Sequence, residues 1–225
     1  MAHHHKKHEW TEERSERFII SVNKKQYKRR YIPIAKKIVY FMELANINAN
    51  SRVVDIGCGP GFLLFEIHRI LPKIEIIGID ASDLMISTAI ENVKKKNILK
   101  FDFKKGYAEN VPIQDKFTYV SICNNSLHDF KDWKKAIKEI FRILKPNGIF
   151  ILRDRNGTYP KWKFFLLLFR IGLKNALRYF KASKRHLWLD PKITEEFMVD
   201  LGFQIIFSES KEHYIIVGKK IIKPT

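Results

Sequence analysis

The stretch Val53-Val-Asp-Ile-Gly-Cys-Gly-Pro-Gly61 decides the fold of this chain. A short apolar run, Arg52–Ile56, leads into a turn with three glycines, and apolar residues at helical spacing begin at Phe62. Glycines let the backbone pass close to a ligand because they lack a Cβ atom. The free N–H groups that open the following helix would face that ligand. The stretch therefore predicts a buried strand, a ligand-binding turn and a helix.

Strands and helices alternate along the rest of the chain. Helical spacing begins at Thr11 and again after Pro33, before the glycine turn. Further strands are predicted at Ile74–Ile79, Phe101–Lys104, Tyr119–Cys123, Ile149–Leu152, Phe203–Ser208 and Tyr214–Lys219. Further helices are predicted at Phe62–Ile70, from a cap at Ser82 or Asp83 to about Lys96, at Trp133–Leu144 up to a stop at Lys145–Gly148, and at Thr194–Leu201. This alternation predicts an α/β fold: a mostly parallel seven-stranded sheet with helices on both faces.

Composition limits the class of protein. The 225 residues are 45% hydrophobic with only 10 Gly and 8 Pro, which excludes a collagen-like or disordered chain. Two cysteines are too few for a disulfide framework or a four-cysteine zinc site, so we expect no metal. The longest apolar run, Phe164–Phe169, is far shorter than the ~20 residues that span a bilayer. We therefore expect a cytoplasmic protein.

The charge balance is strongly basic. Lys and Arg total 42 against 24 Asp and Glu, a formal net charge of +18. Such a balance is typical of a protein with a polyanionic partner, and equally of one whose exposed faces carry many solvated lysines. Both interpretations stay open.

Two acidic residues accompany the glycine turn. Asp80 follows Gly61 by nineteen positions, at the end of the next predicted strand, where a carboxylate accepts hydrogen bonds from ribose hydroxyls. Asp55 precedes the first glycine by two residues, and its charge would repel a pyrophosphate but stabilise an ammonium group. S-adenosylmethionine carries an ammonium group and a ribose but no phosphate. The alternative is that Asp55 only holds the turn through backbone amides.

Five stretches, in order, resemble the motifs of class I S-adenosylmethionine-dependent methyltransferases, particularly the ubiquinone/menaquinone-biosynthesis-like branch. They are Val53–Gly61, Ile76–Ser82 with Met85, Gly106–Ile113, Cys123–Phe130 and Glu139–Leu152. The resemblance runs from about Tyr27 to Lys220. It implies a Rossmann-like fold and transfer of a methyl group from S-adenosyl-L-methionine to an acceptor by in-line displacement.

The resemblance also implies a set of cofactor-binding residues. The backbone of Gly57 and Gly59 would contact the methionine part beside Asp55, and Asp80 would bind the ribose. The other members of the implied set are Cys58, Gly61, Ala81, Met85, Ala108, Glu109 and Asn124. One departure concerns adenine, because Tyr107 stands where the family commonly has an aspartate. A phenol oxygen, Glu109 or a backbone carbonyl would have to replace it.

Four residues are candidates for catalysis. His128 and Asp129 follow the fourth predicted strand and are the best candidates for acid–base chemistry. The alternative is that Asp129 or Asp132 caps the next helix and His128 is a polar wall residue. Tyr27 and Tyr31 match N-terminal tyrosines that often close over the cofactor in this family, although core packing explains them equally well.

A basic and aromatic segment, residues 159–188, follows the fifth predicted strand. Apolar residues fall on one helical face of this segment and cations on the other. It could be a substrate cover or homodimer surface, a helix on an anionic membrane, or a contact for nucleic acid. We expect residues 1–26 to form a tail and helix, and residues 27–225 to form one methyltransferase domain that includes this cover.

Methyl transfer to a small apolar or anionic molecule is the leading hypothesis. One alternative is an RNA or rRNA methyltransferase, which the positive net charge favours. The other is a non-catalytic methyltransferase-like binding protein, because Tyr107 departs from the family pattern and no base is evident.

Overall fold

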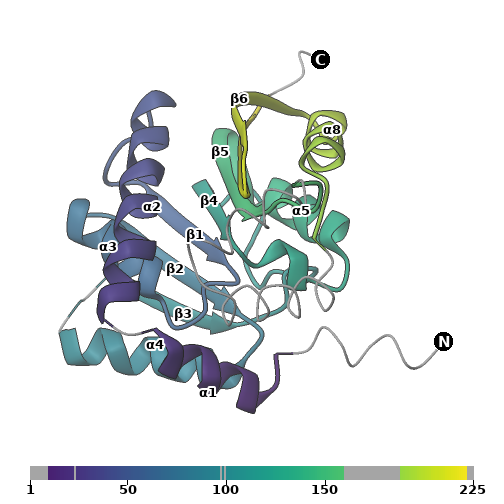
Figure 1. The fold of residues 1–225 in the computed structure, drawn as a ribbon. Coiled ribbons are helices and arrows are strands. Elements are labelled where there is room, and N and C mark those ends of the chain that lie inside the picture. The colour runs from purple at the N-terminus through teal and green to yellow at the C-terminus, as the bar shows by residue number, and fades with distance from the viewer. Residues whose placement is uncertain (1–9, 23, 97, 99, 160–187, 222–225) are drawn as a thin grey trace.

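The computed structural model describes residues 10–22, 24–96, 98, 100–159 and 188–221, and Figure 1 shows one central sheet between helices. The strands are β1 (Arg52–Ile56), β2 (Glu75–Asp80), β3 (Phe101–Lys105), β4 (Thr118–Asn124), β5 (Leu144–Arg155), β6 (Phe203–Ser210) and β7 (His213–Lys220). Their order is β3-β2-β1-β4-β5-β7-β6. The pairs from β3 to β5 are parallel, and β7 is antiparallel to both neighbours. The predicted mostly parallel seven-stranded sheet is confirmed.

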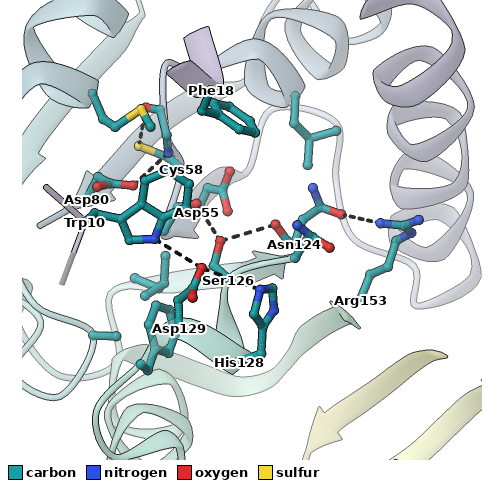
Figure 2. Close-up of a pocket in the computed structure, with 18 of the residues that line it drawn as sticks. Trp10, Phe18, Asp55, Cys58, Asp80, Asn124, Ser126, His128, Asp129 and Arg153 are labelled. Atoms are coloured by element: carbon teal, nitrogen blue, oxygen red, sulfur yellow. Dashed lines mark hydrogen bonds and ion pairs between the residues drawn. The ribbon is translucent and has the colours of Figure 1, made fainter. Parts of the chain in front are cut away.

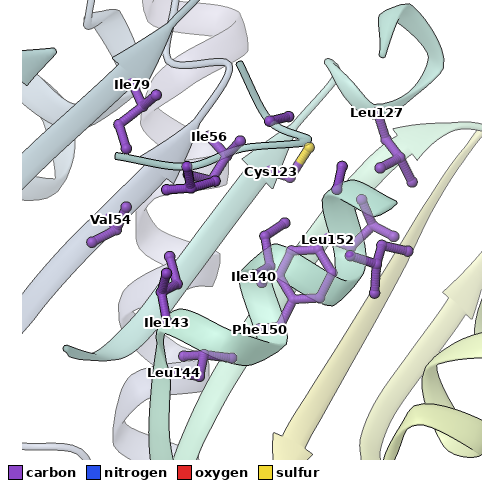
Figure 3. Close-up of a cluster of buried hydrophobic side chains, with 14 of the residues drawn as sticks. Val54, Ile56, Ile79, Cys123, Leu127, Ile140, Ile143, Leu144, Phe150 and Leu152 are labelled. Carbon is purple, nitrogen blue, oxygen red and sulfur yellow. The ribbon is translucent and has the colours of Figure 1, made fainter. Parts of the chain in front are cut away.

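Helices cover both faces of the sheet. They are α1 (Glu12–Ser21), α2 (Lys24–Leu44), α3 (Phe62–Ile70), α4 (Asp83–Lys96), α5 (Trp133–Ile143) and α8 (Pro191–Leu201), with a 3-10 turn η2 (Leu127–Asp129). Successive strand residues point to opposite faces. Val54 and Ile56 therefore join the core cluster beneath α5 (Figure 3), while Val53 joins a second cluster with residues of α2 and α3.

The prediction that the second helix starts after Pro33 was wrong. Helix α2 begins at Lys24 and contains Pro33. A proline inside a helix removes one backbone hydrogen bond and typically costs ~3 kcal/mol. Ring packing offsets this cost, because Tyr27 and Tyr31 place their ring centroids 5.4 and 5.6 Å from that of Phe62. Tertiary contacts therefore hold the first half of the helix in place.

The predicted stop at Lys145–Gly148 lies inside β5 rather than between elements. The strand pairing passes from Thr118 with Leu144 to Val120 with Ile149, so the intervening residues form a bulge. Asn147 adopts a left-handed φ of 62° within it. A bulge is invisible in the apolar pattern, which shows only the run that begins at Ile149.

Other boundaries moved by a few residues. Helix α8 begins at Pro191 rather than Thr194, because Asp190 caps it and proline is favoured at the first helical position. The predicted cap at Ser82 is confirmed, since its Oγ accepts a 3.4 Å hydrogen bond from the Met85 backbone. Of the expected cover segment 159–188, residues 160–187 lie outside the described part of the chain. No helix within the described ranges is long and apolar enough to cross a bilayer.

Candidate active site

A cleft of about 2480 Å³ opens at the carboxyl ends of the parallel strands, as expected for such a sheet (Figure 2). Residues that end or follow β1, β2, β4 and β5 form its floor. The helices α1 and α2 also contribute to its wall through Arg14, Phe18 and Arg30, among others. The cleft therefore joins the glycine turn to the N-terminal helices.

The glycine turn is held open by left-handed backbone angles. Gly57, Gly59 and Gly61 have φ values of 75°, 55° and 77°, which favour glycine. The Gly57 backbone N–H donates to the Ile79 carbonyl at 2.8 Å, and its carbonyl accepts from Ser126 Oγ at 2.9 Å. A Cβ atom on Gly57 would lie 2.5 Å from the Ser126 Cβ atom. The turn is thus tied to the strand and loop on either side of it.

Asp80 supports the same turn. Its Oδ2 accepts a 2.9 Å hydrogen bond from the Gly59 backbone, and its Oδ1 accepts one of 3.0 Å from the Ser82 backbone. Burial raises the pKa of this carboxyl group, while these amides oppose the increase. Carboxylate oxygens accept more than one hydrogen bond, so Asp80 keeps capacity for a diol in the cleft.

Asp55 is the unusual group of the site. Its side chain is buried, with 2% of the residue exposed, and Oδ1 has no hydrogen-bond partner among the described residues. Burial, followed by the charge of Asp80, raises its pKa to about 8. The alternative role of fixing the turn through backbone amides finds no such bond to Oδ1. A buried carboxylate oxygen without a partner is unfavourable unless a proton or a cation meets it.

The residues implied as cofactor-binding converge on this cleft with one exception. The cleft is lined by Asp55, Gly57, Cys58, Gly59, Asp80, Ala81, Met85, Ala108, Glu109 and Asn124. Gly61 instead begins helix α3 as its N-cap and faces the ring of Phe103. Tyr107, at the departure from the family pattern, also lines the cleft and is 62% exposed. Their roles in binding remain predictions.

His128 is paired with a residue that sequence reasoning did not select. Its Nδ1 lies 2.6 Å from Oδ1 of Asp154 on β5, and its Nε2 lies 3.5 Å from Oδ2 of Asp129. Burial acts to lower the His128 pKa, but Asp154 and then Asp129 outweigh it and the pKa is raised. An imidazole held in this way at a cleft can accept or give up a proton.

Asp132, rather than Asp129, caps helix α5, because its Oδ1 accepts a 3.0 Å hydrogen bond from the Lys135 backbone. Asp129 instead contacts the N-terminal segment. The Arg14 Nη2 lies 3.0 Å from its Oδ1, and the Trp10 Nε1 donates to its Oδ2 at 3.1 Å (Figure 2). Sequence reasoning missed this contact, since nothing in the spacing of α1 points to a partner more than a hundred residues away.

The two tyrosine candidates differ in position. Tyr31 lines the cleft, and burial raises its pKa to about 12, so it stays protonated. Tyr27 is not among the lining residues; its hydroxyl donates to the Phe62 carbonyl at 3.3 Å and its ring packs on Tyr31. Within the described part of the chain, no three His, Cys, Asp or Glu side chains gather as metal ligands would.

Comparison with known protein sequences identifies relatives of this chain. A family model described as a methyltransferase domain matches residues 47–198. The uncharacterized methyltransferase YcgJ of Bacillus subtilis (strain 168) is 33% identical over 113 residues, which span 50% of this chain and 44% of that relative. A demethylmenaquinone methyltransferase of Listeria monocytogenes serotype 4b (strain CLIP80459) is 27% identical over 179 residues, 77% of this chain and 75% of that one.

Solved structures share the fold. The crystal structure of YcgJ from Bacillus subtilis matches with a TM-score of 0.64 and 21% identity, covering 84% of this chain and 99% of that one. A SAM-dependent methyltransferase from Aquifex aeolicus matches with a TM-score of 0.64 and 14% identity, covering 89% and 100%. At these identities the likeness concerns the fold alone, which is Rossmann-like.

Proposed function

This chain belongs to the methyltransferase-domain family, and from that premise we propose that it transfers the methyl group of S-adenosylmethionine to a small-molecule acceptor. The cofactor and the acceptor share the cleft at the carboxyl ends of the strands. The chain is an S-adenosylmethionine-dependent enzyme of the transferase class. The named relatives support this proposal through their descriptions as methyltransferases.

The observation that carries the proposal is the unpartnered, buried carboxylate oxygen of Asp55 beside the glycine turn. A phosphate-bearing cofactor would disfavour ionisation of this carboxyl group further, whereas the ammonium group of a methionine moiety would favour the carboxylate form and pair with it. Asp80 lies at the end of the neighbouring strand, where it would accept hydrogen bonds from ribose hydroxyls. The pair fits an adenosyl-methionine ligand better than a dinucleotide.

In this proposal some residues of the cleft bind the cofactor and others accept a proton from the acceptor. Asp55, Gly57 and Gly59 hold the methionine end of the cofactor, and Ala81 and Met85 flank its adenine. When bound, S-adenosylmethionine supplies a methyl group that is already activated towards a nucleophile. His128, oriented by Asp154, accepts the proton of an acceptor that enters the cleft protonated.

Several finer assignments belong to the same proposal. Residues 27–225 form the methyltransferase domain behind a tail and helix at 1–26. The segment 159–188 contributes to acceptor selection, to a homodimer contact, or to binding of an anionic membrane surface or nucleic acid. The enzyme acts in the cytoplasm. Both cysteines, Cys58 and Cys123, are free and buried, which is in keeping with a reducing compartment.

Calorimetric titration with S-adenosylhomocysteine, 5′-methylthioadenosine and NAD tests the cofactor assignment. We expect S-adenosylhomocysteine to bind and NAD not to bind. Asp55→Asn removes a charged hydrogen-bond acceptor and should lower the affinity for S-adenosylhomocysteine by about 10- to 100-fold. It should affect 5′-methylthioadenosine less, because that molecule has no ammonium group.

Asp102→Asn is the matched control, since Asp102 lies on β3 outside the cleft and 54% of its side chain is exposed. It should leave all three affinities unchanged. Binding of NAD in place of S-adenosylhomocysteine, or equal losses for both adenosyl ligands in Asp55→Asn, would contradict the assignment.

A further inference from the structure

Arg153 occupies the side of the cleft away from Asp80. It lies at the end of β5 in register with Asn124 of β4, and its Nη1 donates to Asn124 Oδ1 at 3.3 Å. Figure 2 shows Asn124 between Asp55 and Arg153. The Arg153 guanidinium therefore lies next to the cofactor region but beyond the residues assigned to the cofactor.

The Arg153 guanidinium has little to balance its charge. Burial lowers its pKa to about 10, so it remains charged at neutral pH. Its hydrogen bond goes to a neutral amide, and among the described residues no carboxylate oxygen lies within ion-pair distance of it. A buried cation with no anion in contact has an uncompensated desolvation cost, and an anionic group that enters the cleft would offset this cost.

Two more arginines and a histidine extend the same positive region. Arg155 lies two positions along β5, on the same face as Arg153, and pairs in register with His213 of β7. Burial, then Arg153 and Arg155, and more weakly Arg30 of α2, lower the His213 pKa to about 3, so this imidazole stays neutral. All four side chains line the cleft.

The acidic residues near this region leave the balance positive. The charge of Asp154, and more weakly that of Glu212, acts on Arg153, and Glu212 lines the same cleft. Asp154, between the two β5 arginines, points to the opposite face, where it bonds His128. Among the described residues, Asp154 and Glu212 are the carboxylates that act on Arg153, and the cleft there also carries the guanidinium groups of Arg30 and Arg155.

We propose that Arg153, Arg155, Arg30 and His213, here called the β5 arginine site, bind a carboxylate or phosphate group of the methyl acceptor. The acceptor is then a small, water-soluble organic anion whose reactive atom lies towards Asn124. Guanidinium groups suit this role because they bind carboxylate and phosphate oxygens in a bidentate manner and keep their charge when buried. The inference rests on the proposed function, since it needs the cofactor in the adjoining part of the cleft.

Methyl transfer into fractionated cell extract tests the proposal. An extract of the source organism is separated into an RNA fraction, a lipid fraction, and small molecules that an anion-exchange resin retains or passes. Each fraction is incubated with the full-length protein and S-adenosylmethionine labelled in its methyl group. We expect label in the retained small-molecule fraction. That arm separates a free anion from a lipid headgroup or an RNA phosphate.

Variants then connect that acceptor to the site. Arg153→Gln should lower kcat/KM for the retained fraction by about 10-fold or more, mainly through KM, because it removes a charged hydrogen-bond donor. Arg153→Lys keeps the charge and should restore part of the loss. Lys192→Gln removes one charge from helix α8, where 85% of the Lys192 side chain is exposed, and should change nothing.

Binding of S-adenosylhomocysteine, measured on every variant, distinguishes failure of the proposed function from failure of the anion-site proposal. If wild type fails to bind it, the proposed function fails. If it binds, the anion inference is overturned by label in the neutral, lipid or RNA fractions, by no label at all, or by an unchanged KM in Arg153→Gln. Retained S-adenosylhomocysteine affinity in Arg153→Gln also shows that this variant folds.

Discussion

The Nδ1 atom of His128 lies 2.6 Å from Oδ1 of Asp154, and the His128 backbone N–H donates to Oδ2 of the same carboxylate at 3.1 Å. Both side chains are almost fully buried, with 6% and 1% exposed. This two-point attachment sets the orientation of the imidazole and leaves Nε2 on the side of Asp129. A histidine in η2, the turn that follows β4, is thereby held by strand β5.

Asp154→Asn should destabilise the protein more in acid than in alkali. The folded-state pKa of His128 is raised above its ordinary value of 6.5, so the stabilisation is complete below about pH 6.5 and lost as pH rises through the folded-state pKa. Removing one partner of a buried ion pair costs about 3–5 kcal/mol. We expect a loss of that order near pH 5.5 and a smaller one near pH 9, in urea unfolding.

The exposed Asp200 of helix α8 provides the control, because Asp200→Asn should change stability little at either pH. An equal loss of stability in Asp154→Asn at both pH values would show that Asp154 does not stabilise the protonated form of His128.

Asp55→Asn should stabilise the free protein while weakening cofactor binding. The folded-state pKa of Asp55 is about 8, above the ordinary value of 3.8 for this side chain. Folding therefore takes up a proton between these limits, and stability falls as pH rises from about 4 to 8. Asparagine does not titrate, so folding of the variant needs no proton uptake at this position. Its free energy of unfolding should exceed that of the wild type by at least about 1 kcal/mol near pH 8. Thermal unfolding at about pH 5 and pH 8 measures this; equal stability at pH 8 would contradict it.

Gly57→Ala should be far more damaging than Gly59→Ala. Both glycines have left-handed φ angles, so alanine costs about 1–2 kcal/mol in backbone strain at either position. At Gly57 the new Cβ would also lie 2.5 Å from the Ser126 Cβ, whereas the nearest atom at Gly59 is the Met85 sulfur at 3.9 Å. We expect a loss of about 3 kcal/mol or more for Gly57→Ala in urea unfolding. Similar losses for the two variants would mean that Ser126 moves aside.

Arg14→Gln should loosen helix α1 over the cleft. Arg14 pairs with Asp129 at 3.0 Å, and the neighbouring Ser15 shares a buried 3.0 Å hydrogen bond with Ser82 at the start of α4. Loss of the ion pair should raise hydrogen exchange in α1 and speed S-adenosylhomocysteine dissociation several-fold. Arg17→Gln, on the same helix, is the control, because the ion pair of Arg17 among the described residues is with Glu13, one turn away, and 70% of its side chain is exposed. Equal behaviour of the two variants would exclude a role for the Asp129 contact.

Local spacing was sufficient wherever neighbouring residues decide the structure. The glycine turn, the cap at Ser82 and the strand-end position of Asp80 follow from short patterns, because turns and caps depend on a few consecutive residues. The start of α2 and the β5 bulge did not follow. Ring packing with Phe62 decides the first, and pairing of Thr118 with Leu144 decides the second.

The sequence by itself determined that a mostly parallel sheet carries a glycine turn with acidic residues at two strand ends. Only the tertiary structure decided which side chains meet: Arg14 with Asp129, His128 with Asp154 and Asn124 with Arg153, which are 115, 26 and 29 positions apart. The physical reason is that strand order places β4 beside β5 and helix packing places α1 near η2. Burial then sets the charge state of each group. A local sequence pattern predicts neither which distant side chains meet nor how deeply they are buried.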